Sequence, residues 1–325
     1  TDEIRSLSEV SAVATSVGPQ DGGVPRLSVL RRTTATILGI GALLGASACS
    51  TGGGASIGLA TPGGSDTGAG AAVTVGPMFT DEVFHDPVTG QSLPYNLHLP
   101  ADYNPARAYP MIVYLADAGA TGGPVTTPLA DVGARVWAAD AEQAVRPSLV
   151  VVPEYPRAVL DDATGAVTGD YLEMTTRLVT SLEIGYAVDQ GRVYGTGVGM
   201  GATAVAHLAA EHPDLFAAAL LVGGRPDLAD PKGLADATLV SVAASEDQAA
   251  VTAQSAARDL LVKRHVVCGS DTWDAGWSAA RLSASAHRAL AEGNSATLIR
   301  IAGGDAATAY RIAGLREWLF AQSMD

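Results

Sequence analysis

The stretch Asp189–Gly224, DQGRVYGTGVGMGATAVAHLAAEHPDLFAAALLVGG, decides the fold of this chain. A short strand-forming segment ends at Thr196, a glycine-rich turn follows, and an alanine-rich helix is predicted from Met200. The apolar run Ala218–Val222 then predicts a second strand. Strand, helix and strand in this order form the unit from which parallel sheets with flanking helices are built.

The same alternation continues on both sides of this stretch. Continuous apolar runs such as MIVYL and LVVV are typical of strands that are buried on both faces of a parallel sheet. The predicted strands are Thr80–His85, Leu93–Leu99, Met111–Ala116, Ser148–Val152, Arg192–Thr196, Ala218–Val222, Thr238–Ala243 and Ala296–Ile301. The predicted helices are Tyr171–Tyr186, Met200–Glu211, Asp247–Lys263, Trp277–Glu292 and Ala307–Gln322. We expect an α/β fold with a mostly parallel, doubly wound sheet of about eight strands, opened by an antiparallel edge hairpin.

The glycine-rich turn reads Gly197-Val198-Gly199-Met200-Gly201. Its flanking glycines have a steric reason, because a strand and a helix approach each other closely at such a turn. The turn resembles the nucleophile elbow of the α/β-hydrolase superfamily, in the secreted esterase and peptidase branch near the polyhydroxybutyrate depolymerases and feruloyl esterases. In that branch the line typically runs D-x-x-R-x-Y-x-T-G-x-S-M-G and is followed, after a helix, by P-D-L-F-A-A. The matching positions are Asp189, Arg192, Tyr194, Thr196, Gly197, Met200, Gly201 and Pro213–Ala218.

The resemblance extends over nearly all of residues 78–322. The stretch Leu93–Gly119 resembles the opening strands and oxyanion loop of the family, and Ala309–Gln322 resembles its C-terminal helix. The resemblance therefore implies an α/β-hydrolase fold and the chemistry of carboxylic ester or peptide hydrolysis.

The chain departs from the family at the positions that carry this chemistry. Gly199 stands at the nucleophile position, and a residue without a side chain cannot form an acyl-enzyme. The oxyanion loop, usually H-G-x-G, reads Ala116-Asp117-Ala118-Gly119. The resemblance implies that this loop and Met200 supply two backbone N–H donors. A carboxylate at Asp117 would oppose the negative charge that such donors stabilise.

The other two members of a catalytic triad are also affected. Asp247 matches the acid position after the seventh strand, and it is equally well explained as the N-cap of the following helix. The histidine expected after the last strand is absent from Ala302–Thr308, where Asp305 holds roughly its place. The remaining histidines are interpreted as structural or surface residues. Because the histidines are scattered and the cysteines number two, we expect no metal site and no cofactor.

The same glycines allow an alternative, a dinucleotide-binding protein. Gly197-x-Gly199-x-x-Ala202 satisfies the fingerprint G-x-G-x-x-A, and Arg225 or Asp227 could serve the ribose or its phosphate. The motif lies far inside the domain, however, and its flanking residues match the hydrolases.

The first 76 residues are predicted to be an export and anchoring region. Residues 1–30 are interpreted as a disordered tail and residues 31–49 as a signal peptide, with Arg31-Arg32 before an uncharged run that is too short to span a bilayer. The run ends in Ala46-Ser47-Ala48-Cys49, which resembles a lipobox whose Cys49 is lipidated. Residues 50–76 are predicted to be a flexible linker and residues 77–325 the globular domain. This organisation predicts a bacterial cell-surface lipoprotein that follows the twin-arginine route.

Two functional hypotheses follow. The first is a pseudoenzyme, an anchored binding or scaffold protein. It would bind a small ester, glycan or peptide ligand in the cleft where the family has its active site. The second is an active carboxylic ester hydrolase with a non-standard site, in which Asp117, Asp247 or Asp305 directs a water molecule. The formal net charge of −14 argues against nucleic acid as a partner and leaves the lipid as the only expected contact with a membrane.

Overall fold

The computed structural model describes residues 78–161 and 164–324, which belong to one compact unit, Gly68–Asp325. The predicted tail, signal segment, lipidated Cys49 and linker lie outside the described residues. Within the described part, no helix has the length and apolar character to cross a membrane.

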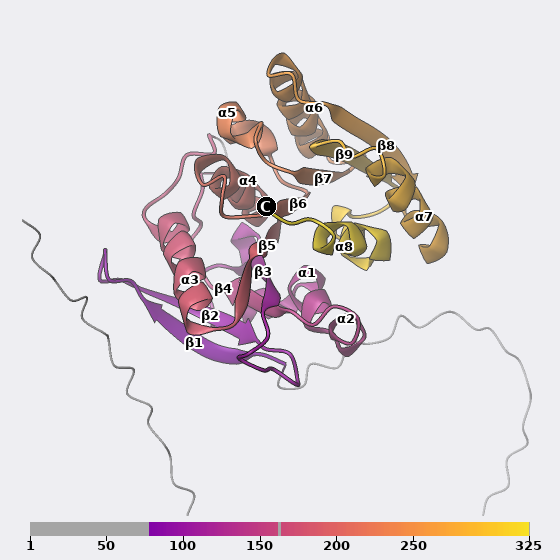
Figure 1. The fold of residues 1–325 in the computed structure, drawn as a ribbon. Coiled ribbons are helices and arrows are strands. Elements are labelled where there is room, and N and C mark those ends of the chain that lie inside the picture. The colour runs from indigo at the N-terminus through magenta and orange to yellow at the C-terminus, as the bar shows by residue number, and fades with distance from the viewer. Residues whose placement is uncertain (1–77, 162–163, 325) are drawn as a thin grey trace, which may run out of the picture. The chain divides into compact units, whose positions relative to one another are not determined.

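A nine-stranded sheet runs through the domain in the order β1-β2-β4-β3-β5-β6-β7-β9-β8 (Figure 1). The strands are β1 Thr80–His85, β2 Ser92–His98, β3 Tyr109–Leu115, β4 Leu149–Pro153, β5 Val188–Val198, β6 Ala218–Val222, β7 Leu239–Ala244, β8 Cys268–Asp274 and β9 Ala296–Ala302. The pairs β1–β2 and β2–β4 are antiparallel, and the other neighbours are parallel. The predicted fold class and edge hairpin are thereby confirmed.

Helices cover both faces of the sheet. The α-helices are α1 Val132–Arg135, α2 Asp140–Gln143, α3 Tyr171–Gly185, α4 Met200–Glu211, α5 Pro231–Leu234, α6 Gln248–Lys263, α7 Ala279–Leu290 and α8 Ala313–Phe320. The 3-10 helices are η1 Ala118–Ala120, η2 Thr127–Ala130, η3 Val136–Ala138, η4 Pro226–Leu228 and η5 Ala306–Arg311. One apolar layer joins α3 and α4 to the sheet, and a second joins α1, α7, η5 and α8 to the opposite face (Figure 1).

One strand more is present than the sequence predicts. The segment Cys268–Asp274 (CGSDTWD) has no apolar run, but it pairs in parallel with β9 at the edge of the sheet. Its buried side chain is that of Trp273, while Ser270 and Thr272 are exposed on the other face. The strand is therefore held by one aromatic anchor and by backbone pairing, which apolar periodicity does not reveal.

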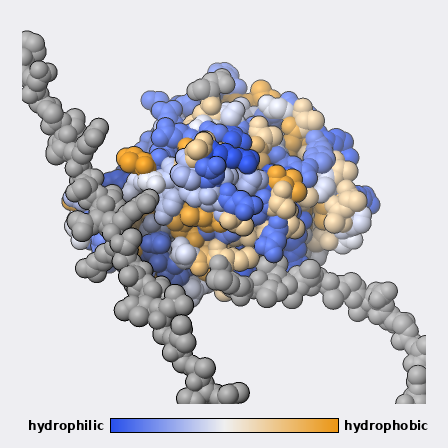
Figure 2. Space-filling model, turned by 60° about the horizontal axis from the view of Figure 1, so that its bottom comes forward, coloured by the Kyte–Doolittle hydropathy of each residue, from blue (hydrophilic) through white to orange (hydrophobic). Residues whose placement is uncertain are grey.

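The surface shows little that suggests a broad apolar interface. On the face drawn in Figure 2, apolar patches are scattered among polar residues. The exposed large hydrophobic side chains among the described residues come from separate elements: Val83, Val88, Val145, Val167, Ile184, Val262 and Val267. A ligand site is therefore expected at the carboxyl ends of the parallel strands, where α/β sheets bind ligands.

Candidate functional site

The predicted tight turn lies between β5 and α4. Gly199 has φ 55° and ψ −119°, a conformation that side-chain-bearing residues rarely adopt, and its N–H donates a hydrogen bond to the carbonyl of Val222 at 2.9 Å. A Cβ atom on Gly201 would overlap the carbonyl of Leu115 on the neighbouring strand. Backbone geometry thus requires a glycine at position 201, and Gly199 has the positive φ that the sequence predicts for an elbow.

The side chain of Asp117 fills the space above Gly199. Its Oδ1 accepts a hydrogen bond from the backbone N–H of Met200 at 2.9 Å. An ideal Cβ placed on Gly199 would lie 2.7 Å from Cγ of Asp117 and closer still to Oδ1. The carboxylate therefore occupies the place of a side chain at the nucleophile position.

The same contact changes the predicted oxyanion loop. Met200 N–H is one of the two donors that the family resemblance implies, and in this structure it is engaged by a carboxylate. Ala118, from the same loop, begins the short helix η1 directly after Asp117. A negative group at the N-terminus of α4 is favourable for the helix but opposes a second negative charge beside it. The carboxylate of Asp117 thus places a negative charge of the protein itself in this site.

The two predicted carboxylates, Asp247 and Asp305, are used as helix caps. Asp247 Oδ1 accepts from the N–H of Ala250 at 3.0 Å, and Asp305 Oδ1 accepts from the N–H of Ala307 at 3.0 Å. These contacts match the capping interpretation of Asp247.

A third carboxylate, that of Glu246, reaches the loop in which the resemblance implies a histidine. Its Oε1 accepts from the N–H of Gly303, in the loop after β9, at 3.1 Å. The only signal for this role in the sequence is its place next to Asp247 in the same loop. Glu246 is therefore the carboxylate that links the acid position to the loop in which a histidine would stand.

The loop after β9 lies beside the elbow. A Cβ on Gly223 would lie 3.7 Å from Cβ of Ala306 and 4.0 Å from the backbone nitrogen of Gly199, so η5 begins beside the turn. In β5, just before the turn, Thr196 Oγ1 donates to the carbonyl of Leu220 at 2.8 Å. The same oxygen lies 3.1 Å from the hydroxyl of Tyr310. Burial raises the pKa of Tyr310, which keeps this hydroxyl protonated. The framework of a hydrolase site is present, and the side chain of Thr196 is fully used within it.

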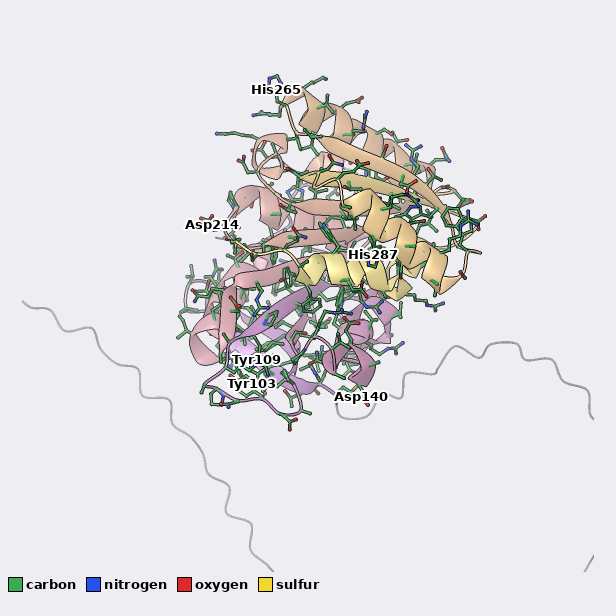
Figure 3. All side chains as sticks on the ribbon, turned by 45° about the vertical axis from the view of Figure 1, so that its right-hand side comes forward. Tyr103, Tyr109, Asp140, Asp214, His265 and His287 are labelled. Carbon is green, nitrogen blue, oxygen red and sulfur yellow. The ribbon has the colours of Figure 1, made fainter. Side chains whose placement is uncertain are left out.

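The described histidines lie at positions other than the loop after β9, and some of them contact carboxylates. His212 and His287 lie 2.9 Å and 2.6 Å from carboxylate oxygens of Glu173 and Glu317. His265 follows α6, and Figure 3 shows it at one end of the domain, away from His287. His207 points from α4, and burial lowers its pKa. Ligand-type atoms of Glu173, Glu211 and His212 lie within 4.8 Å of one another, at the surface where α4 ends.

A cavity adjoins the elbow. It has a volume of about 290 Å³ and is lined by Leu160, Asp161, Gly165, Gly199, Met200, Thr203, Gly223, Arg225, Leu228 and Ala249. A larger hollow of about 550 Å³ lies between α6, β8 and β9, away from the elbow. We take the smaller cavity as the candidate site, because it contains the turn at which the family places its chemistry.

The geometry disfavours the dinucleotide interpretation of the same glycines. A dinucleotide places its pyrophosphate at the N-terminus of the helix, where the carboxylate of Asp117 already accepts the N–H of Met200. Arg225 lies 3.8 Å from Asp227, so the two candidate ribose contacts face each other.

Comparisons with known proteins agree with the hydrolase framework. No protein-family model and no curated protein match the chain. Among solved structures, a thermostable esterase is similar at 25% identity and a TM-score of 0.62, over 76% of this chain and 64% of that one. The chain thus spans less than two thirds of that esterase. A feruloyl esterase module from Clostridium thermocellum, solved as a serine-to-alanine mutant with sinapinate, is similar at 12% identity and a TM-score of 0.52, over 75% and 88% of the two chains. The chain thus has the α/β-hydrolase fold and is similar in structure to esterases of that fold.

Proposed function

We propose that this protein binds a small ligand in the cavity beside the elbow and does not form an acyl-enzyme there. The observation that carries the proposal is the position of Asp117, whose carboxylate takes the space of the nucleophile side chain and the N–H of Met200. An acyl-enzyme needs an attacking oxygen or sulfur on the elbow and free donors for the oxyanion. Gly199 provides no such atom.

The base position supports the same proposal. A serine nucleophile is activated by a histidine that a carboxylate orients. In this chain the loop after β9 carries Asp305, which caps η5, and Glu246 contacts the backbone of Gly303 instead of an imidazole ring. Nucleophile, oxyanion donor and base are thus all replaced, while the turn and the cavity that would hold a ligand are kept.

One observation favours a second candidate, a hydrolase with a non-standard site. The carboxylate of Asp117 lies at the point where the esterases attack their substrate, and a carboxylate there could direct a water molecule. This candidate needs no residue on the elbow itself. It predicts ester turnover that depends on Asp117.

A steady-state assay separates the two candidates. The full chain is incubated with p-nitrophenyl acetate, alongside Asp117→Asn and the surface variant Asp214→Asn as a matched loss of one charge. The binding proposal predicts that all three rates equal the rate in buffer. Saturable turnover that falls in Asp117→Asn, but not in Asp214→Asn, would establish the hydrolase instead.

We also propose that the chain is exported and anchored through a lipid on Cys49, because the lipobox-like sequence and paired arginines precede a Gly/Ser/Thr-rich tether. Expression of the full chain in a bacterium, with fractionation of wild type and Cys49→Ala, tests this. Wild type is expected with the membranes and Cys49→Ala in the soluble exported fraction. Equal distribution of the two would contradict the anchor.

A further inference from the structure

The elbow presents an acceptor where an esterase presents donors. In an esterase, backbone N–H groups face the developing oxyanion of the substrate. In this chain Asp117 Oδ1 is bound to the N–H of Met200, and the carboxylate covers Gly199. Oδ2 makes no hydrogen bond with any other described residue, so the carboxylate can accept from a ligand. The group that a ligand meets at the elbow is therefore negative.

The cavity beside the elbow is mainly apolar. Asp117 is exposed and does not itself line this cavity, but it contacts two residues that do, Gly199 and Met200. Leu160, Leu228 and Ala249 contribute aliphatic side chains, and Met200 contributes its buried thioether. A volume of about 290 Å³ is at the lower end of the range of small-molecule sites. The cavity suits a short apolar body attached to one polar head.

The other charged groups around the cavity leave the net charge near the elbow negative. Asp161 is a second carboxylate in the wall. Arg225 is the one cation that lines the cavity in the described part of the chain, and it lies 3.8 Å from Asp227. Glu246 and Asp305 add negative charge near the loop after β9. The charged groups around the elbow thus favour a positive head.

We infer that the ligand of this site is an amphipathic cation, an aliphatic or aromatic amine whose ammonium group bonds to Asp117 and whose apolar body enters the cavity. The inference rests on the proposed function and names its ligand class. An ammonium offers three donors and no acceptor, which complements a carboxylate fixed by one backbone N–H. Neutral esters and carboxylates, the substrates and products of an esterase, lack this complementarity.

Three probes of six carbon atoms each test the inference: hexylammonium, hexan-1-ol and hexanoate. Each is titrated calorimetrically into the full-length chain at low ionic strength. We expect hexylammonium to bind about tenfold more tightly than hexan-1-ol, and hexanoate to bind more weakly than either. Asp117→Asn keeps the acceptor for Met200 N–H and removes the charge, so it should bind hexylammonium and hexan-1-ol equally. Asp214→Asn, whose carboxylate lies on the surface beyond the end of α4 (Figure 3), should keep the preference.

The outcomes separate this inference from the proposed function. Equal binding of the three probes, or a preference for hexanoate, overturns the amine inference and leaves a ligand-binding protein. Ester turnover that depends on Asp117 overturns the proposed function itself. Binding of none of the probes also overturns the inference, and the comparison of probes on wild type decides the matter even if Asp117→Asn fails to fold.

Discussion

Asp117 and Gly199 lie 82 positions apart in the chain, and the carboxylate of Asp117 stands where Gly199 would carry a Cβ atom. The carboxylate is fixed by the N–H of Met200, one residue beyond Gly199. The two residues depend on each other, because a side chain at position 199 would displace the carboxylate of Asp117. The glycine at the elbow and the carboxylate above it are thus one structural arrangement.

A double-mutant cycle on stability tests this coupling. Gly199→Ser should destabilise the domain by about 3 kcal/mol, because the serine Cβ meets the carboxylate and the residue keeps a positive φ. In an Asp117→Gly background the clash is gone, and the same change should cost about 1–2 kcal/mol less. Urea denaturation of the four proteins measures the difference. Additive effects would mean that the two side chains do not share one space.

A serine at position 199 alone should not confer esterase activity, since no histidine stands in the loop after β9. Gly199→Ser is expected to hydrolyse p-nitrophenyl acetate at the buffer rate. Combination with Asp117→Gly and Asp305→His frees the N–H of Met200 and places an imidazole in the loop beside the elbow. We expect the triple variant to exceed Gly199→Ser by on the order of 100-fold. Strong activity in the single variant would reveal a base elsewhere in the chain.

The pair Asp86–Arg177 should make stability sensitive to acid. Asp86 accepts two hydrogen bonds from Arg177, at 2.8 Å and 2.9 Å, and this contact holds the pKa of the carboxyl far below its ordinary range. Because the folded pKa is lowered, the pair stabilises the domain above the unfolded pKa of about 4 and loses this effect as the pH falls below it.

Asp86→Asn should therefore lower the midpoint of thermal unfolding at pH 7 and flatten its decline below pH about 4. The melting temperature is measured from pH 2.5 to 7 for wild type, Asp86→Asn and the exposed control Asp140→Asn. An unchanged acid slope in Asp86→Asn would assign the acid sensitivity to other carboxylates.

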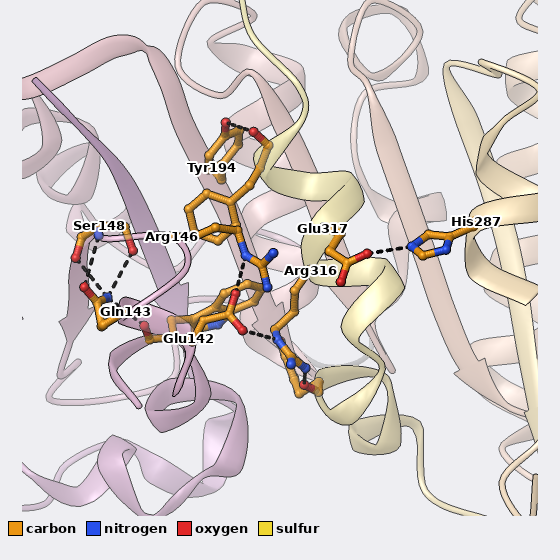
Figure 4. Close-up of polar contacts among 11 residues, drawn as sticks. Glu142, Gln143, Arg146, Ser148, Tyr194, His287, Arg316 and Glu317 are labelled. Atoms are coloured by element: carbon orange, nitrogen blue, oxygen red, sulfur yellow. Dashed lines mark hydrogen bonds and ion pairs between the residues drawn. The ribbon is translucent and has the colours of Figure 1, made fainter. Parts of the chain in front are cut away.

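The network around Glu142 joins α2 to α8 (Figure 4), and Arg316 also donates to the carbonyl of Tyr310 in η5. Glu142 is 5% exposed and accepts from Arg146 at 2.6 Å and from Arg316 at 2.8 Å. Burial works against ionisation of Glu142, but the two guanidinium groups outweigh it and keep its pKa below the ordinary value.

Glu142→Ala leaves two arginines without their buried partner and should destabilise the domain by about 3 kcal/mol. The control is His287→Ala, which breaks the exposed pair His287–Glu317 in the same region and should cost less than about 1 kcal/mol. Chemical denaturation compares the two variants. Similar losses would show that the buried network is no stronger than the surface pair.

The sequence was informative where local pattern determines structure. The runs at Ala218–Val222 and Met200–Glu211 have the same bounds in the structure as predicted, because continuous burial and a glycine-rich turn leave few alternatives. The edge strand at Cys268–Asp274 was missed, since pairing with β9 and one buried tryptophan hold it rather than an apolar run.

At the site, residue types could be predicted but not their contacts. The absence of a serine at Gly199 is visible in the sequence, whereas the direction of the Asp117 side chain depends on a contact between distant segments. Likewise, the choice between Glu246 and Asp247 depends on which side chain caps α6 and which faces Gly303. Neighbouring carboxylates in one loop differ only in orientation, which a linear pattern does not encode.

Covalent labelling shows whether a nucleophile operates at this elbow. The full chain is incubated with a fluorophosphonate, and its intact mass is measured before and after. We expect no increase in mass for the native protein, with a serine esterase labelled in parallel as the positive control. A single stoichiometric adduct on a residue lining the elbow cavity, such as Thr203, would contradict it.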